Sequence, residues 1–352
     1  MQNAYGKYGK LLSGVFSFLL LIGFTSIMAK VAGSLLSAFT GLSLGWSAII
    51  VVGVVVLYTY FGGMRGSVYT DAYQTVIFGV ALIMLLLVSM YKSSIGFSGA
   101  VSQGIDLGVG TISAMSFLAI LGFVFSMMFG EVFLPPMVGR ALSAKNAGVS
   151  KKTFITTGIL TPVILFFVLL IGIFASNGII GLETVADNAA MTIAGTVLGA
   201  GFFGFFLIAL LSIVMSSLDS LLQAGAVVAS NDVFFWKEED SSKKLTISRL
   251  ATVVLGILGA ILALYIPDLI STLLILYAIW IPVMVIPFLY ALFSKRATPS
   301  AGILSMILGG TSAYLWEFTI QSPGGLPGVI FGTIVSLIVM EVVLSFKKTS
   351  VA

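Results

Sequence analysis

The stretch that decides the fold is Leu210-Leu211-Ser212-Ile213-Val214-Met215-Ser216-Ser217-Leu218-Asp219-Ser220, which lies inside the apolar run 201–230. A run of this length can cross a bilayer, because a spanning helix needs about 20 mostly apolar residues. The run nevertheless carries a carboxylate, Asp219, near its middle. An ionisable group at that depth costs a few kcal/mol and usually marks a functional site. The stretch therefore predicts a membrane helix with a functional acid.

The composition of the chain extends this prediction to the whole protein. Of 352 residues, 59% are hydrophobic and only 9% are charged, and the mean hydropathy is +1.16. About a quarter of the residues in an average soluble domain are charged, which argues against a globular enzyme or a nucleic-acid-binding protein. The chain has no cysteine and no histidine, which excludes disulfides, thiolate or imidazole metal sites and histidine acid–base catalysis. We expect an all-α polytopic membrane protein.

Ten apolar segments are long enough to span the membrane, and several exceed the usual length, which predicts tilt or breaks. They are 11–38, 45–61, 72–91, 113–135, 153–178, 201–230, 249–266, 269–293, 300–317 and 327–346. Two connecting segments, 93–112 and 179–200, are rich in glycine and serine. We expect these two to hold short interfacial helices or lids.

Basic residues gather on alternate connections between the predicted spans. Of the 17 lysines and arginines, 15 precede the first span, follow the last one or lie on every second connection. Only Lys30 and Lys92 break the pattern, and both can snorkel to the outer interface. Because cytoplasmic loops carry an excess of Lys and Arg, we expect a multi-pass protein of the plasma (cytoplasmic) membrane with both ends of this chain in the cytoplasm.

Polar residues form a stripe along the predicted span 201–230. At 100° per residue, one helical face carries Ser212, Ser216, Asp219, Ser220 and Gln223. A row of oxygen donors with one carboxylate suits a hard cation such as sodium. Alternatively, the serines are packing residues that hydrogen-bond across helices. The central aspartate favours ion or proton coupling over packing.

Two further acids lie near the ends of predicted spans. Asp71 directly precedes the span 72–91, and local chemistry favours an N-cap role, since Asp stabilises the positive end of a helix. Glu131 lies shortly before a pair of prolines, in a run of glycines, aromatic residues and methionines. A helix broken in this way can line a cavity and bind a ligand or ion. Equally, Glu131 can pair with Arg140 near the cytoplasmic end.

Two motifs resemble the signatures of the sodium:solute symporter family. Residues 58–74, Tyr-Thr-Tyr-Phe-Gly-Gly-Met-Arg-Gly-Ser-Val-Tyr-Thr-Asp-Ala-Tyr-Gln, resemble its Tyr-Thr-x-x-Gly-Gly…Thr-Asp-x-x-Gln signature. Residues 186–220 resemble the second signature, an Ala-Asp-x-Ala segment at 186–189 that leads to Met-Ser-Ser-x-x-Ser at 215–220. The stretches 231–234 and 135–145 are also similar to family segments, with Gly139 in place of a glutamine.

The resemblance implies a LeuT-type inverted-repeat bundle in which sodium crosses with a small solute by alternating access. Ser216 and Ser217 match hydroxyls of the family's sodium site, and Ile213 matches the residue whose backbone carbonyl joins them. Asp71 matches an aspartate that is implicated in a further cation site in some members. We therefore expect sodium to be the coupling ion, with Ile213, Ser216, Ser217, Asp219 and Asp71 as its ligands.

The resemblance also implies how the chain is divided. Residues 1–352 form one transmembrane domain, in which 1–92 holds three helices of an incomplete first repeat. Residues 113–293 hold the five helices of the second repeat, and 300–347 hold two accessory helices. In the family, two or three further helices precede these and complete the sodium site. We therefore expect this chain to be a fragment, or a product that does not transport alone.

The solute is less sharply defined than the ion. The residues that we expect to contact it are Phe125, Ser126, Phe129, Gly130, Glu131 and Gln223. The positions comparable to the asparagine and aromatic gate residues of sugar-transporting members fall at 127–131, and their identity argues against a sugar. The Ser-Ser-x-Asp-Ser pattern at 216–220 resembles members that carry amino acids, organic acids or quaternary amines.

These observations predict a secondary active transporter, a sodium-coupled symporter of a small organic solute, and not an enzyme. The expected partners are that solute and the lipid bilayer, with no nucleic acid. The alternative is a non-transporting membrane sensor or assembly subunit built on the same fold.

Overall fold

The computed structural model of the chain describes residues 1–114, 116–176, 189–234 and 241–349. The chain divides into two compact units. Unit 1 comprises Met1–Ile27, Met115–Gly139 and Leu221–Ala352, and unit 2 comprises Met28–Ala114 and Arg140–Ser220. Three helices contribute residues to both units: α1 (Gln2–Thr40), α5 (Pro135–Leu142) and α8 (Ala200–Val228).

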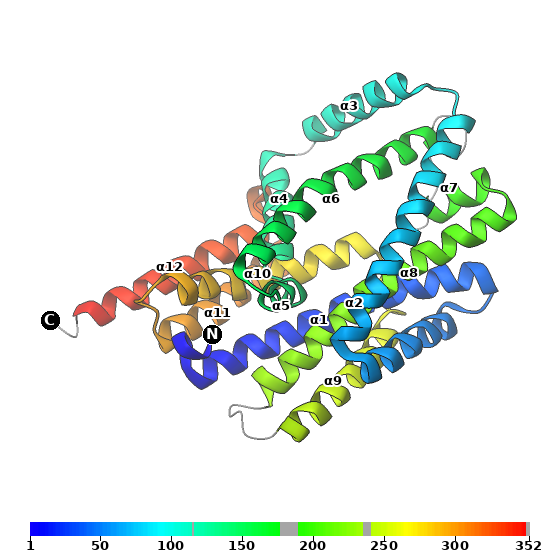
Figure 1. Cartoon of the computed structure of the whole chain (residues 1–352). Helices are drawn as coiled ribbons and strands as arrows, with labels where there is room; N and C mark the ends of the chain where they lie inside the picture. The colour runs from blue at the N-terminus through cyan, green and yellow to red at the C-terminus, as the bar shows by residue number, and fades with distance from the viewer. Residues whose placement is uncertain (115, 177–188, 235–240, 350–352) are drawn as a thin grey trace. The chain divides into compact units, whose positions relative to one another are not determined.

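Unit 1 is organised around three long helices near the C-terminal end of the described chain. These are α10 (Leu269–Phe293), α11 (Pro299–Tyr314) and α12 (Gly328–Thr349), which pack side by side (Figure 1). The Ser305 hydroxyl donates a hydrogen bond to the Ser336 carbonyl at 2.7 Å, and a Cβ on Gly309 would lie only 2.8 Å from the Pro282 carbonyl oxygen. Small residues thus let these helices approach closely, as is common in membrane bundles.

The rest of unit 1 consists of shorter or partial helices. They are α4 (Phe117–Val132), most of α5 (Pro135–Leu142), the end of α8 with its π-helical turn Ala229–Val233, and α9 (Ser241–Leu262). The start of α1 is anchored here, because the buried Tyr5 hydroxyl donates to the Pro287 carbonyl at 2.6 Å.

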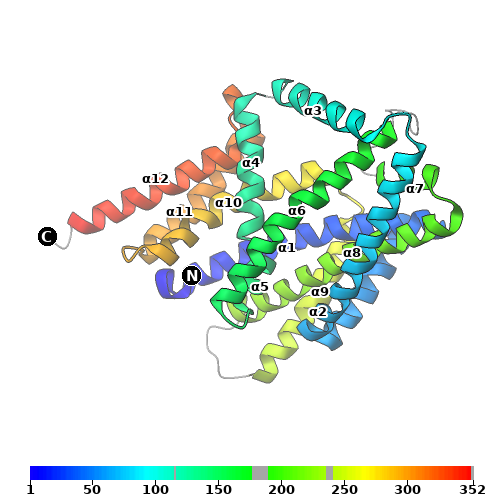
Figure 2. The same cartoon turned by 45° about the horizontal axis from the view of Figure 1, so that its top comes forward.

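Unit 2 contains α2 (Leu44–Lys92), α3 (Phe97–Ala114), α6 (Ala147–Ser176), α7 (Ala189–Val197) and residues 200–220 of α8. Helix α6 packs against α2, α3 and α7 (Figure 2). A buried apolar cluster that includes Leu85, Ile171, Val197 and Phe206 joins four of these helices. This apolar cluster packs the N-terminal part of α8 against α2.

Helix α2 joins two predicted spans across a glycine break. The break is at Gly63, where φ is 52° and ψ is −153°, a conformation that is essentially restricted to glycine. The two parts that are apolar enough to span a membrane are Leu44–Gly63 and Gly66–Lys92. The second span therefore begins well before residue 72, where the sequence pattern places it.

The predicted span 113–135 is also broken. Helix α4 ends at Val132, α5 begins at Pro135, and the two are bent by 43°. Proline lacks a backbone N–H and has its φ already fixed for a first helical turn, so it starts α5 more readily than it would continue α4. The predicted break of this helix is confirmed.

The described part of the chain contains fewer candidate spans than the ten that the sequence predicts. Within the described ranges, eight helices are long and apolar enough to cross a membrane, or nine if the bent α4–α5 pair is one span. Helix α11 has only 16 residues, fewer than a bilayer usually requires. Helix α3 occupies the predicted interfacial segment 93–112 and is not among the candidate spans, whereas much of the segment 179–200 lies outside the described residues.

Apolar side chains on the outer surfaces support a membrane location. In α6, only 22% of the most apolar window is buried, and Ile159 and Leu165 are more than half exposed. A water-soluble protein rarely exposes a continuous apolar surface of this kind, but a surface in contact with lipid tails requires it. The chain is a multi-pass, all-α membrane protein.

Candidate functional site

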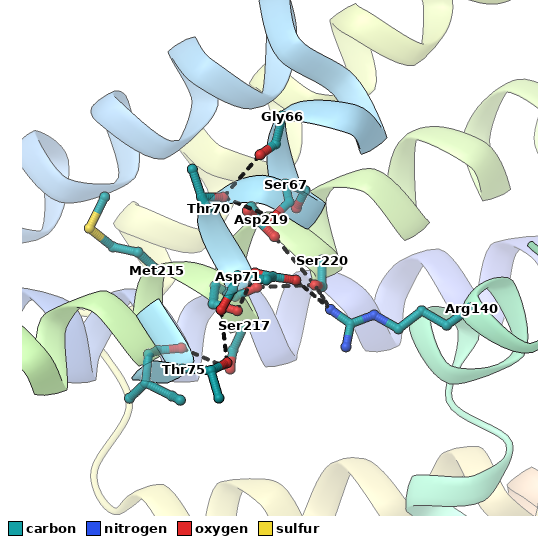
Figure 3. Close-up of polar contacts among 12 residues, drawn as sticks. Gly66, Ser67, Thr70, Asp71, Thr75, Arg140, Met215, Ser217, Asp219 and Ser220 are labelled. Carbon is teal, nitrogen blue, oxygen red and sulfur yellow. Dashed lines mark hydrogen bonds and ion pairs between the residues drawn. The ribbon is translucent and has the colours of Figure 1, made fainter. Parts of the chain in front are cut away.

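Asp219 is a carboxylate buried inside unit 2. It lies on α8 and has no exposed surface. The Tyr58 hydroxyl donates a hydrogen bond to its Oδ2 at 3.1 Å, and the Ser220 hydroxyl donates to its Oδ1 at 3.3 Å. Ser67 lies next to it (Figure 3). These neighbours are neutral hydroxyls, and among the described residues Asp219 has no cationic side chain within ion-pair distance.

Asp71 lies inside the second part of α2 and faces α8. Its Oδ1 accepts a short hydrogen bond from the Ser216 hydroxyl, and its Oδ2 lies 3.2 Å from Nη2 of Arg140. The N-cap interpretation of Asp71 is wrong, because the helix already begins at Gly66 and its carboxylate makes contacts far along the chain. The side chain links α2, α5 and α8 instead.

Arg140 completes a connected polar network, the Asp71–Asp219 cluster, which consists of Tyr58, Asp71, Arg140, Ser216, Asp219 and Ser220. Its Nη2 donates to the Ser220 hydroxyl at 2.6 Å as well as to Asp71. Figure 3 shows the guanidinium reaching from α5 toward the residues of α2 and α8. All members of this cluster belong to unit 2.

Two predicted sodium ligands, Ile213 and Ser217, flank the polar stripe of α8. The Ser217 hydroxyl donates to the Ile213 carbonyl at 3.2 Å (Figure 3). Ser216 and Ser217 are therefore directed differently, one toward Asp71 and the other toward its own helix backbone. The cluster links Asp71, Ser216 and Asp219, whereas Ser217, next to Ser216 in the chain, contacts Ile213 one turn earlier in α8.

With both carboxylates ionised, the cluster carries one negative charge in excess, since it holds Asp71 and Asp219 but a single guanidinium. No group of three or more His, Cys, Asp or Glu side chains that could hold a metal occurs among the described residues. Oxygen donors with a single excess charge suit a hard monovalent cation better than a divalent one, which usually collects more carboxylates.

The predicted solute-contacting residues lie in unit 1. On α4, the rings of Phe125 and Phe129 are 4.6 Å apart at their centroids, and Ser126 is buried. The Tyr277 hydroxyl of α10 donates to Glu131 Oε1 at 2.7 Å. A Cβ on Gly130 would lie 2.6 Å from the Tyr277 ring, so only glycine fits there.

Glu131 does not pair with Arg140, because Arg140 pairs with Asp71. The Glu131 carboxylate accepts a hydrogen bond from Tyr277 instead. Gln223, on α8, has a buried Nε2 atom without a hydrogen-bond partner among the described residues. The solute candidates on α4 and Gln223 belong to unit 1, and the expected sodium ligands belong to unit 2. Asp187 of the second signature, and the motif part 186–188, lie outside the described residues.

Three residues of this site were missed as participants by the sequence analysis. Tyr58 lies in a quoted motif without an assigned role, Arg140 is considered only as a partner of Glu131, and Tyr277 is not considered. Their partners lie 161, 69 and 146 residues away along the chain. Helical periodicity relates only residues on one helix, so no local pattern could identify these pairs.

A bundle of apolar helices that carries a polar network of carboxylates, hydroxyls and one guanidinium is the geometry of a polytopic membrane protein with a functional polar site. The chain belongs to the sodium:solute symporter family, whose family model matches residues 5–309. The family resemblance, the all-α fold and sodium as the coupling ion are thereby confirmed.

Curated relatives are similar over most of the chain. The sodium/pantothenate symporter of Haemophilus influenzae is 26% identical over 95% of this chain and 72% of its own length. The sodium/pantothenate symporter of Escherichia coli is 27% identical over 87% of this chain and 66% of its own length. The sodium/sialic acid symporter NanT of Aliivibrio fischeri is 24% identical over 94% and 69%. The chain thus spans roughly two thirds to three quarters of these relatives.

A solved structure shares the fold. It is the substrate-bound outward-open state of a sodium-coupled sialic acid symporter, with a TM-score of 0.84 at 16% sequence identity. The match covers 98% of this chain and 76% of that chain. At this identity the likeness shows the fold alone, and the roles of individual residues stay predictions.

Proposed function

We propose that the chain couples the movement of sodium to that of a small organic solute, and that the Asp71–Asp219 cluster takes part in binding the cation. The observation that carries this proposal is the excess negative charge of a network whose central carboxylate, Asp219, is fully buried. A buried charge without a partner is strongly destabilising. A monovalent cation that binds there restores neutrality, and the surrounding hydroxyls supply the oxygen ligands that it prefers.

Ile213 and Ser217 form a second set of oxygen donors in this proposal. The Ile213 carbonyl oxygen and the Ser217 hydroxyl oxygen are 3.2 Å apart, so both can coordinate one ion through their lone pairs. Ser217 is exposed in unit 2, so its hydroxyl is accessible to an arriving ion. The proposal is supported by the family's match over this region.

Sodium-dependent thermal stability tests the cation site. A ligand that binds only the folded state stabilises it by about 2.7 kcal/mol at 100 times its dissociation constant. We expect the purified chain in detergent to melt at a higher temperature in sodium than in the same concentration of potassium or choline. The shift should be lost in Asp219→Asn and reduced in Ser217→Ala. Asp106→Asn, which changes an exposed acid of α3, is the matched control. Equal protection by sodium and potassium would disprove sodium selectivity.

For the solute, we propose a small organic acid. The named relatives are symporters of pantothenate and sialic acid, and both solutes carry a carboxylate. Since sialic acid is also a sugar acid, a solute with sugar-like hydroxyls fits as well, and the expectation that a sugar is disfavoured has no support from these relatives.

A cationic solute is the second candidate, because of one specific contact. Glu131 is exposed, and its carboxylate accepts a hydrogen bond from the hydroxyl of the aromatic residue Tyr277. A carboxylate beside aromatic rings recognises amines through charge and cation–π attraction. An amino acid or quaternary amine is the solute class that this arrangement favours.

A solute screen separates the two candidates. In saturating sodium, the melting temperature is measured with pantothenate, sialic acid, choline, an amino acid mixture and a neutral sugar. An organic acid that raises it, in sodium but not in potassium, supports the first candidate. Stabilisation by choline alone, lost in Glu131→Gln, would replace it with the second. Protection by the neutral sugar alone would contradict both.

We also propose that the chain lies in the plasma membrane with both its ends in the cytoplasm, an arrangement supported by the alternation of basic connections. The division into repeats at 1–92 and 113–293, followed by accessory helices at 300–347, stays a prediction.

A further inference from the structure

One nitrogen atom of Arg140, Nη2, contacts oxygen atoms of two other residues of the Asp71–Asp219 cluster. Nη2 contacts Asp71 Oδ2 at 3.2 Å and the Ser220 hydroxyl oxygen at 2.6 Å. The same Ser220 hydroxyl donates to Asp219, and the other oxygen of Asp71 accepts from Ser216. The positively charged guanidinium thus contacts two of the oxygens that an ion at this position would use.

The guanidinium has the charge of a monovalent cation but differs from a free ion in two respects. It is weakly hydrated, so it loses little on entering a polar site. It is also tethered to α5, so it is always present near Asp71 whatever the sodium concentration. A charge-assisted pair with a carboxylate is among the stronger hydrogen bonds, and it satisfies Asp71 without any ion.

The side chain of Arg140 is able to leave this position. It is 53% exposed, whereas that of Asp71 is 25% exposed. Ion pairs of partly exposed side chains are weak, so the guanidinium can exchange for another cation. Asp219, by contrast, is fully buried and keeps its hydroxyl partners whether or not Arg140 is in place.

We propose that Arg140 is a tethered cation that occupies a position between Asp71 and Ser220 and competes there with a free monovalent cation. The proposal rests on the proposed function, since it requires the cluster to bind sodium. It assigns Arg140 a role in setting the sodium affinity: the apparent dissociation constant rises as the fraction of time during which the guanidinium fills the position increases.

Sodium titration of Arg140→Gln tests this role. Sodium is varied at constant ionic strength with choline, and the midpoint of the thermal stabilisation is compared with that of the unchanged chain. We expect the midpoint to fall by about tenfold, the factor that follows if the guanidinium fills the position about nine-tenths of the time. In Arg140→Lys, which keeps a tethered cation, the midpoint should stay within about threefold of the unchanged chain.

The matched control is Arg296→Gln. Arg296 pairs with Glu341 at 3.1 Å and is 48% exposed, so this change removes a similar ion pair, but one that belongs to unit 1 and not to the cluster. Its sodium midpoint should not move. A second readout is competition: millimolar guanidinium, far below denaturing concentrations, should weaken sodium binding in Arg140→Ala more than in the unchanged chain.

The outcomes are distinguishable. A midpoint that is unchanged or higher in Arg140→Gln, with the unchanged chain still responding to sodium, overturns the competition and makes Arg140 a residue that positions Asp71. Absence of a sodium response in every variant contradicts the proposed function instead. If Arg140→Gln does not fold, guanidinium competition in Arg140→Ala and the Arg140→Lys titration decide, and no selective effect in either rejects the proposal.

Discussion

Asp219 shows what decides the chemistry at the scale of single residues. A carboxylate in the middle of an apolar helix needs several donors, and here they come from a different helix, through Tyr58 of α2, and from the adjacent Ser220. The Tyr58 hydroxyl also lies 3.3 Å from the Met215 carbonyl. It therefore fixes the carboxylate relative to the backbone of α8.

The role of Tyr58 can be tested by removing its hydroxyl alone. A hydrogen bond to a charged group contributes about 1.5–3 kcal/mol, so Tyr58→Phe should lower the free energy of unfolding by about that amount in the absence of sodium. Sodium should restore part of the lost stability, because a bound cation neutralises the Asp219 carboxylate that the missing hydroxyl no longer stabilises. Chemical denaturation with and without sodium measures both effects.

Tyr69→Phe is the control for this prediction, since Tyr69 lies on the same helix and is 72% exposed. It should leave stability unchanged. Equal stability of the two phenylalanine variants without sodium would show that the Tyr58 hydroxyl does not support Asp219.

The sequence predicts Asp219 better than it predicts its neighbours. A charged residue in an apolar run is visible from composition alone, as is the periodic stripe that includes Ser216 and Ser220. The contact between Tyr58 and Asp219 joins residues 161 positions apart. It depends on how α2 and α8 pack, which a single sequence does not specify. The prediction that Asp71 is an N-cap is wrong for the same reason. Its contacts with Ser216 and Arg140 arise from tertiary packing, which local capping chemistry does not describe.

At the level of helices, long uninterrupted apolar runs predict where a helix lies, but the sequence predicts the breaks between helices less accurately. Helix α10 covers 269–293, the same residues as the predicted span. Helix α2 differs, because the polar residues 62–71 indicate a loop but form helix on both sides of Gly63. In α11 and α12, serines do serve as packing residues, as the buried Ser305–Ser336 contact shows. The same residue type thus has different roles in α8 and α11.

The break in α2 gives a prediction with a close control. Alanine at Gly63 must adopt a φ of 52°, a region that costs about 1–3 kcal/mol for a residue with a side chain. Gly63→Ala should therefore lower the melting temperature. Gly62→Ala should not, because Gly62 has no positive φ, and an added Cβ would contact nothing within 4 Å at either position. Equal melting temperatures would mean that the kink is not imposed by Gly63.

At the scale of the whole molecule, the apolar composition and the alternation of basic connections predict the class and topology. The family match over 5–309 confirms the class. The division of the chain into units does not follow the predicted repeats, since unit 1 combines residues from both ends of the chain. Compactness depends on packing between distant segments, which hydropathy does not encode.

The topology can be tested directly because the chain contains no cysteine, so single cysteines can be labelled without background. A membrane-impermeant maleimide added to intact cells should label Ser102→Cys, on the predicted outer helix α3. Lys145→Cys, on the connection between α5 and α6, should react only after the cells are permeabilised. The reverse pattern would invert the orientation, and labelling of both in intact cells would rule out the alternation.

Sodium coupling by this chain requires the Asp71–Asp219 cluster to bind a monovalent cation. Equilibrium binding of radiolabelled sodium to the purified chain tests this claim most directly. We predict saturable binding that unlabelled sodium displaces and the same concentration of potassium does not, and that is lost in both Asp71→Asn and Asp219→Asn. Non-saturable binding in the unchanged chain, or undiminished binding in folded Asp219→Asn protein, would contradict it.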